Sequence, residues 1–158
     1  MLRHAKSDWD DSSLKDFDRP LASRGKHDAP RIGKALKKRG PLPDLVISSP
    51  AARAKATIEA FIPAAGLEIV PQFEGGIYDA HSDELMRIIR DIPDTSNCAI
   101  MVGHNPGFEN TVSRLTGTDT HMPTAALACI ELPIDRWEDA EDGQGNLVWL
   151  LTPKHLED

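Results

Sequence analysis

The chain has 158 residues, of which 40% are hydrophobic and 27% are charged, as in an ordinary globular protein. This length predicts one domain, spanning residues 1–158, with a core of its own. The net charge of −7 argues against a nucleic-acid partner, because binding to the phosphate backbone relies on clustered lysines and arginines.

Apolar runs alternate with helical patterns along the chain. Strands are predicted at 43–49, 67–70, 97–103, 126–132 and 147–152, after a strand stub at 1–3. Helices are predicted at 24–39, 50–62, 82–92 and 106–115. Pro30 is expected to start or kink the first helix, whereas Ser49 and Asn105 are expected to cap the second and fourth.

Two features define the predicted architecture. The strands are apolar on both faces, as a sheet covered by helices on both sides requires. The turn sequence at 141–146 indicates that the last two strands pair as a hairpin. We therefore expect an α/β fold, a three-layer α/β/α sandwich with a mostly parallel central sheet of about six strands.

Location is predicted from cysteines, hydropathy and the start of the chain. Cys98 and Cys129 lie in apolar runs without metal-ligand spacing and are expected to be buried free thiols. No stretch approaches the ~20 apolar residues of a membrane span, and no charged-then-apolar leader is visible. We expect a cytoplasmic protein without a membrane partner.

Polar residues follow three predicted strands, in "LRHA", "VISSPAAR" and "IMVGHNP". The carboxyl ends of strands in open α/β sheets bind ligands, and helix N-termini attract anions. These segments predict a cluster of Arg3, His4, Arg53 and His104 around a phosphoryl group. A neutral imidazole can attack phosphorus while arginines stabilise charge on the transferring oxygens, so no metal or cofactor is expected.

Six segments carry a family resemblance: "LRHAKS", "DRPLASRG", "SSPAARAKAT", "VGHNPG", "MPTAA" and "LLTPK", in this order along nearly the whole chain. In them the chain resembles the histidine phosphatase superfamily (phosphoglycerate-mutase-like, branch 1), and within it the small SixA-type phosphohistidine phosphatases. The resemblance implies a phosphoglycerate-mutase-like fold in which the Arg-His pair ends the central first strand. Only two residues precede the pair here, fewer than the family pattern has.

The resemblance also implies roles for individual residues. His4 would be the nucleophile that becomes phosphorylated, and Arg3, Arg53 and His104 would bind the phosphoryl group and its transition state. Arg19 would be a further phosphate or substrate contact, although a structural salt bridge to its aspartate neighbours is the alternative. Asn105, next to His104, is a second candidate for substrate binding.

The sequence does not determine which residue acts as the general acid. The small family members lack the insertion that carries a carboxylate in larger relatives. Glu74 is the candidate, with Asp79 and His81 as alternatives nearby. A phosphoramidate has a good leaving group, so weak acid assistance is expected to be enough for this substrate class.

The leading hypothesis is a metal-independent phosphatase with a phosphohistidine intermediate. A chain with short loops favours an open pocket for a phosphorylated protein, such as phosphohistidine on a signalling or phosphotransfer protein. The oligomeric state is left open, with a monomer favoured. A small phosphoester substrate and a non-catalytic phosphate-binding module are the alternatives. In this mechanism His4 is neutral and His104 is expected to be protonated, so activity would fall at both pH extremes.

Overall fold

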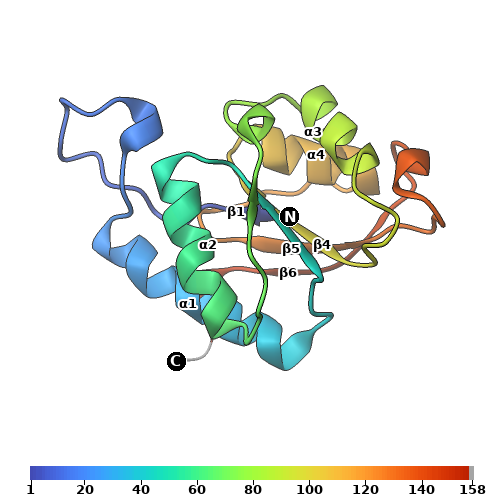
Figure 1. Cartoon of the computed structure of the whole chain (residues 1–158), viewed down its shortest axis with the longest axis horizontal. Coiled ribbons are helices and arrows are strands. Elements are labelled where there is room, and N and C mark those ends of the chain that lie inside the picture. The colour runs from blue at the N-terminus through green and yellow to red at the C-terminus, as the bar shows by residue number, and fades with distance from the viewer. Residues whose placement is uncertain (157–158) are drawn as a thin grey trace.

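A computed structural model describes residues 1–156 and confirms the predicted fold class (Figure 1). One six-stranded sheet carries two helices on each face. The strands are β1 (Leu2–Arg3), β2 (Leu45–Ser48), β3 (Gln72–Phe73), β4 (Ala99–Gly103), β5 (Leu127–Glu131) and β6 (Asn146–Leu151). The α-helices are α1 (Ser23–Arg39), α2 (Ala52–Ala64), α3 (Ser82–Arg90) and α4 (Gly107–Thr116).

The strands follow the order β3-β2-β4-β1-β5-β6 across the sheet. The first four strands in this order are parallel, whereas β5 runs antiparallel to β1 and forms the predicted hairpin with β6. The sheet is therefore mixed and mostly parallel. The parallel strands end at one edge, where the predicted site residues follow β1 and β2 and the strand between them, β4.

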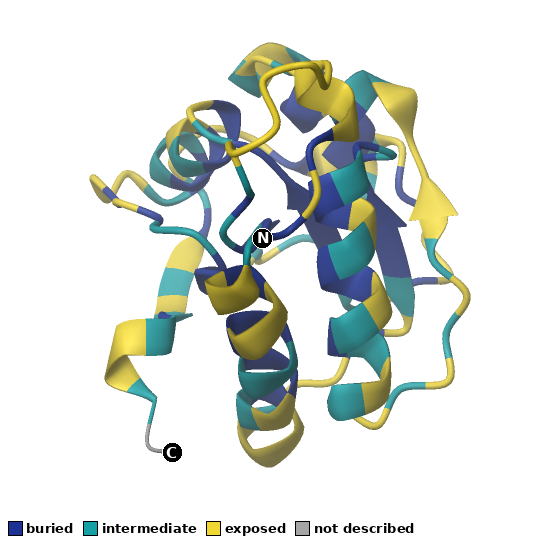
Figure 2. Ribbon diagram, turned by 90° about the vertical axis from the view of Figure 1, so that its left-hand side faces the viewer, coloured by how far each residue is buried: buried dark blue, intermediate teal, exposed yellow. Residues whose placement is uncertain are grey.

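The core lies on both faces of the sheet, as Figure 2 shows by the burial of the helix sides that face it. Helices α1 and α2 cover one face, where Ile32, Ile58 and Phe61 are fully buried. Helices α3 and α4 cover the other face with Leu85 and Phe108. Burial of such side chains contributes about 2 kcal/mol each and fixes both helix layers against the sheet.

The first strand is as short as the sequence indicates, but it lies in the middle of the sheet. The side chain of Leu2 is fully buried, and β1 pairs with β4 on one side and β5 on the other. His4, just beyond the strand, continues this pairing: its N–H donates to Gly103 O at 2.9 Å. Ala125, with a left-handed φ of 60°, donates its N–H to His4 O at 3.0 Å. Two backbone bonds thus fix the Arg-His pair.

One predicted strand is wrong. Residues 67–70 are not a strand, although their apolar side chains alternate, and β3 begins two residues later, at Gln72. Leu67 and Ile69 pack against the α1–α2 core, while Val70 is 86% exposed. The ladder to β2 begins only after Pro71, which has no N–H to donate.

The helix starts also differ from their predictions. Helix α1 begins at Ser23 and runs through Pro30, so this proline does not start it. Ala51 and Pro106 occupy the cap positions of α2 and α4. Ser49 and Asn105, the predicted caps, lie just before them and still accept backbone N–H groups. Cys98 and Cys129 are free, as predicted, but only partly buried.

Candidate active site

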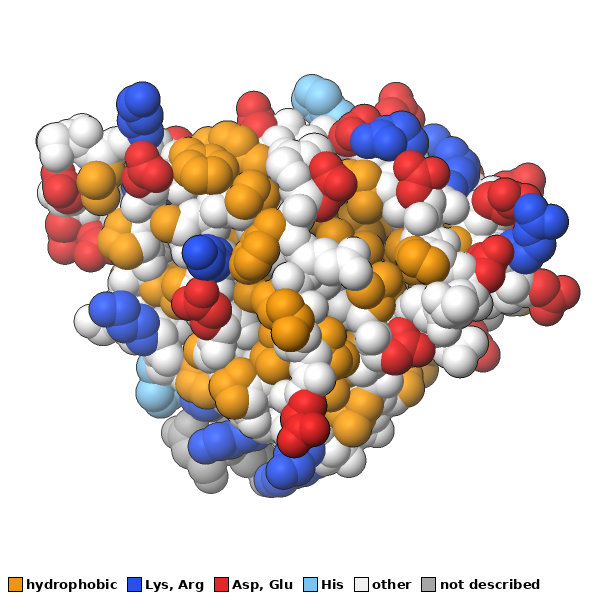
Figure 3. Space-filling model, viewed as in Figure 1, with side chains coloured by type: hydrophobic (Ala, Val, Ile, Leu, Met, Phe, Trp, Pro, Cys, Tyr) orange, Lys and Arg blue, Asp and Glu red, His pale blue; other side chains and the backbone are white. Residues whose placement is uncertain are grey.

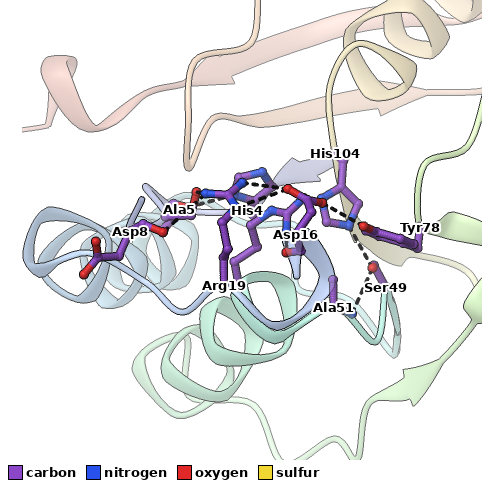
Figure 4. Close-up of polar contacts among 11 residues, drawn as sticks. His4, Ala5, Asp8, Asp16, Arg19, Ser49, Ala51, Tyr78 and His104 are labelled. Atoms are coloured by element: carbon purple, nitrogen blue, oxygen red, sulfur yellow. Dashed lines mark hydrogen bonds and ion pairs between the residues drawn. The ribbon is translucent and has the colours of Figure 1, made fainter. Parts of the chain in front are cut away.

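Side chains from the carboxyl ends of β1, β2 and β4 converge at one edge of the sheet, as Figure 4 shows. The rings of His4 and His104 lie 5.1 Å apart between their centroids and are both more than nine-tenths buried. Arg53 reaches the same place from the first turn of α2, and its side chain is 7% exposed. The structure thus brings His4, His104 and the two arginines Arg3 and Arg53 together at this edge.

The ring of His4 is held in one tautomer. Its Nδ1 lies 2.7 Å from Ala5 O, a carbonyl that can only accept, so Nδ1 carries the proton. Ala5 is fixed in turn, because its N–H donates to Thr57 Oγ1 on α2 at 3.0 Å. In the neutral ring Nε2 therefore keeps its lone pair, the form that a nucleophile needs.

His104 is oriented by Ser49, which is fully buried. The Ser49 hydroxyl accepts the N–H of Ala51 at 3.2 Å and lies 2.8 Å from His104 Nε2. When that hydroxyl donates its proton to Nε2, the proton of the neutral ring sits on Nδ1. Ser49, expected only as a helix cap, is thus a positioning residue for the second histidine.

Three buried nitrogens in this cluster have no hydrogen-bond partner: Arg3 Nε, Arg53 Nε and His104 Nδ1. Among residues 1–156 no other buried side-chain nitrogen or oxygen lacks a hydrogen-bond partner. Leaving a buried donor unpaired costs about 1–3 kcal/mol, and such groups gather where a ligand supplies the partner. Donors from both arginines and a histidine beside a nucleophilic ring suit the oxygens of a phosphoryl group.

Asp16 holds the arginines and was missed as a site residue. It lies in a short 3-10 helix at Asp16–Asp18, and its Oδ1 accepts Arg19 Nε and Nη2 at 3.1 and 3.0 Å. Its Oδ2 accepts Arg53 Nη2 at 3.0 Å and the Tyr78 hydroxyl at 2.7 Å, and its backbone oxygen accepts Arg53 Nη1 at 2.7 Å. These bonds occupy the outer end of the Arg53 guanidinium and leave its Nε edge open.

The remaining predicted site residues lie farther from the phosphoryl cluster. Arg19, predicted as a phosphate or substrate contact, instead makes the alternative salt bridge to Asp16 and donates to Ser7 Oγ at 2.8 Å, while Trp9 stacks on its guanidinium at 3.3 Å. Arg19 is thus engaged by protein groups and contacts the site through Asp16.

Asn105 and Glu74 make structural contacts. The Asn105 amide donates to Met122 O at 2.8 Å, the same carbonyl that accepts Arg3 Nη1 at 3.0 Å. The Glu74 carboxylate is exposed and accepts the N–H of Gly76, in its own turn, at 3.0 Å. Only the backbone of Glu74 contacts the predicted edge, since its N–H donates to Ser48 O at the end of β2. Asn105 therefore anchors the segment that holds Arg3, and the carboxylate of Glu74 points into its turn.

Burial and the arginines keep both histidines neutral at pH 7. Desolvation is the main cause that lowers the pKa of His4, which falls to about 3. The hydrogen bond to Ala5 O opposes this change, whereas the charges of Arg53 and Arg3 lower the pKa further. Desolvation, followed by the charge of Arg53, lowers the pKa of His104 to about 4. The expectation of a protonated His104 is thus wrong for the protein by itself, because burial, and after it the charge of Arg53, disfavours the charged ring. A neutral His104 can still donate from Nδ1.

These shifts predict that the protein loses stability as the pH falls. The folded-state pKa values lie below the ordinary value of 6.5, so the unfolded chain binds protons first. Each histidine is expected to lower the free energy of unfolding by about 2 kcal/mol between pH 6.5 and pH 5. Urea unfolding of the double variant His4→Gln/His104→Gln should therefore depend less on pH than that of the wild type.

The control for this measurement is His81→Gln, at an exposed histidine. It should keep the wild-type dependence on pH. Equal pH dependence in all three proteins would show that the two buried histidines do not titrate as the geometry requires.

Across residues 1–156, no group of three or more His, Cys, Asp or Glu side chains is arranged to hold a metal ion. Within the same range, no helix has both the length and the apolar character to cross a bilayer.

Comparison with known proteins indicates the family to which the chain belongs. A family model described as histidine phosphatase superfamily (branch 1) matches residues 1–74, the part that holds Arg3, His4 and Arg53. A chloroplastic protein of Arabidopsis thaliana, itself uncharacterised, is 35% identical over 161 residues, which are 96% of this chain and 73% of that protein. An uncharacterised Mycobacterium tuberculosis protein is 29% identical, with coverage of 97% and 100%.

Solved structures match over nearly the whole chain. A crystal structure from Agrobacterium tumefaciens that bears the name phosphohistidine phosphatase SixA has a TM-score of 0.83 and 30% identity, covering 96% of this chain and 95% of that one. A protein histidine phosphatase SixA complexed with tungstate has a TM-score of 0.84 at 21% identity, with coverage of 99% and 97%, and supports the fold alone. The chain belongs to the histidine phosphatase superfamily, branch 1. Within that superfamily, its fold is that of the SixA-type proteins.

Proposed function

We propose that this protein is a metal-independent phosphatase that hydrolyses phosphohistidine on a protein through a phosphohistidine intermediate of its own. The observation that carries the proposal is the set of three unpartnered buried nitrogens, from Arg3, Arg53 and His104, beside the ring of His4. These groups supply donors for the phosphoryl oxygens, and His4 supplies the nucleophile.

The proposed reaction has two steps. The lone pair of His4 Nε2 forms a bond to phosphorus while the bond to the leaving group breaks, and the electron pair stays on the leaving atom. Arg3, Arg53 and His104 stabilise the charge on the transferring oxygens. Water then attacks the phosphorylated His4, releases inorganic phosphate and restores the neutral ring.

Two observations support the absence of a dedicated acid and of a metal in this proposal. Glu74 points into its own turn, so its carboxylate is not placed for proton transfer. The imidazole of a phosphohistidine substrate can leave as a neutral ring when its other nitrogen carries a proton, so this substrate makes the smallest demand on an acid. Two guanidinium groups supply the positive charge that a metal ion brings in other phosphoryl-transfer sites.

The test is single-turnover labelling with EDTA present. We expect the protein to remove phosphate from a ³²P-phosphohistidine protein at the same rate with and without EDTA. A rapid quench should trap label on the enzyme that is lost in acid and survives alkali. Inhibition by EDTA that a divalent ion reverses would contradict the metal-free mechanism. Binding of the phosphoprotein without turnover would favour a binding module, and faster turnover of small phosphoesters would reassign the substrate.

A further inference from the structure

A row of aromatic rings runs from the buried nucleophile to the surface. The ring centroids of His4 and His104 lie 5.1 Å apart, those of His104 and Tyr78 5.5 Å, and those of Tyr78 and Phe17 5.1 Å. The last two contacts are edge-to-face, with interplanar angles of 83° and 90°. Phe17 lies in the 3-10 helix Asp16–Asp18 and Tyr78 follows the one at Gly75–Ile77, so two segments distant in the sequence bring these rings together beside His104.

Burial falls along this row. The two histidines are buried, Tyr78 is half-buried and Phe17 is 37% exposed. Phe17 is one residue from Asp16, which bonds both Arg53 and the Tyr78 hydroxyl, so the position of Phe17 relative to the site is fixed. Figure 3 shows acidic and hydrophobic side chains next to each other at the corner of the molecule that the 8–18 segment forms.

The leaving group must point toward the surface end of this row. Arg3, Arg53 and His104 surround the phosphoryl site with buried donors, and in-line displacement sends the leaving group away from His4. Beyond His104, the next rings along the row toward the surface are those of Tyr78 and Phe17. Hydrogen bonds from Arg19, Arg53 and Tyr78 fill the acceptor positions of the Asp16 carboxylate, so it has no free position for a leaving group.

We propose that Tyr78 and Phe17 form a ring wall that makes the site selective for phosphoryl groups on planar aromatic leaving groups, imidazole above all. The inference rests on the proposed function and adds the feature that distinguishes its substrates. In the step that the wall favours, His4 Nε2 bonds to phosphorus and the P–N bond breaks. Its electron pair stays on the imidazole, which leaves as a neutral ring because its other nitrogen carries a proton. Aromatic pairs prefer offset-stacked or edge-to-face contacts, and the wall offers both to a flat ring.

The experiment compares two substrates that share a P–N bond and differ in the ring: N-phosphoimidazole and phosphoramidate. In Phe17→Leu, which keeps apolar bulk and removes the ring, we expect kcat/KM for N-phosphoimidazole to fall about three- to tenfold. Phosphoramidate turnover should change less than twofold. Phe17→Tyr, which restores a ring, should recover most of the wild-type preference.

The matched control is Phe73→Leu, at another exposed phenylalanine, 45% exposed, whose ring faces Lys55. It should leave both rates unchanged. An equal loss on both substrates in Phe17→Leu, or no loss on either, would overturn the ring wall and leave the proposed function intact. A wild type that hydrolyses neither these compounds nor a phosphohistidine protein would overturn the proposed function, and the ring wall with it.

Discussion

Replacement of His4 by alanine is expected to abolish both turnover and covalent labelling, with kcat falling by about 10⁴-fold or more. His4 is the one ring of the cluster whose tautomer is fixed by a carbonyl, with Nε2 left as a lone pair. Its backbone is held by Gly103 and Ala125, so removal of the side chain should leave the fold in place. The measurement is rapid-quench labelling from a ³²P-phosphohistidine protein, together with steady-state rates.

Folding and binding are monitored separately in this experiment. Circular dichroism should match that of the wild type, and the phosphorylated substrate should still bind, since Arg3, Arg53 and His104 remain. His27→Ala, at a histidine of α1 whose side chain is 66% exposed, is the control and should label normally. Acid-labile label on His4→Ala would assign the nucleophile to another residue, and His104 would be the first candidate.

Sequence predicted the parts of this site that lie at strand ends. Arg3, His4 and His104 directly follow or end β1 and β4, and strand order then brings them to one edge. Arg53 was predicted because its segment starts a helix directly after β2. Local pattern was sufficient for these four because parallel strands bring their carboxyl ends together whatever the loops between them do.

Contacts made by loops could not be predicted in the same way. Asp16 lies 37 residues from Arg53 and 62 from Tyr78, and no periodicity relates them. Glu74 lies at the expected edge, but its side chain turns into a short 3-10 helix that has no strong sequence pattern. The wrong strand at 67–70 shares this cause: alternation predicted a strand, and tertiary packing of Leu67 and Ile69 decided otherwise.

The charge of His104 could not be predicted from the sequence for a similar reason. A histidine among arginines was expected to be protonated because a phosphoryl group is an anion. Burial was not visible from the sequence, and desolvation is the largest cause of its lowered pKa. The neutral ring, with Ser49 on Nε2, can donate from Nδ1 without carrying a charge.

Asp16→Ala is expected to lower kcat/KM by about 10²-fold, mainly through kcat, and to lower the free energy of unfolding by about 1–3 kcal/mol, because donors of two buried guanidinium groups lose their partner. The carboxylate is half exposed, yet it binds two guanidinium groups whose side chains are 7% and 8% exposed. Hydrogen bonds, the first from Tyr78, lower its pKa to about 2, so it is charged throughout the working pH range. Without it, Arg53 loses the partner that directs its Nε edge toward the phosphoryl group, and misplaced groups lose catalytic rate steeply.

Asp16→Asn separates the two functions of this carboxylate. The amide keeps one acceptor oxygen and removes the charge, so we expect a loss smaller than that in Asp16→Ala. Asp18→Ala, at the exposed aspartate two residues along the same 3-10 helix, should retain wild-type rates.

The competing interpretation is that Asp16 occupies the place of the substrate's phosphoryl group and must be displaced by it. In that case Asp16→Ala would bind inorganic phosphate more tightly and lower KM without loss of kcat. Phosphate inhibition constants measured beside kcat and KM therefore determine whether Asp16 positions the arginines or competes for them.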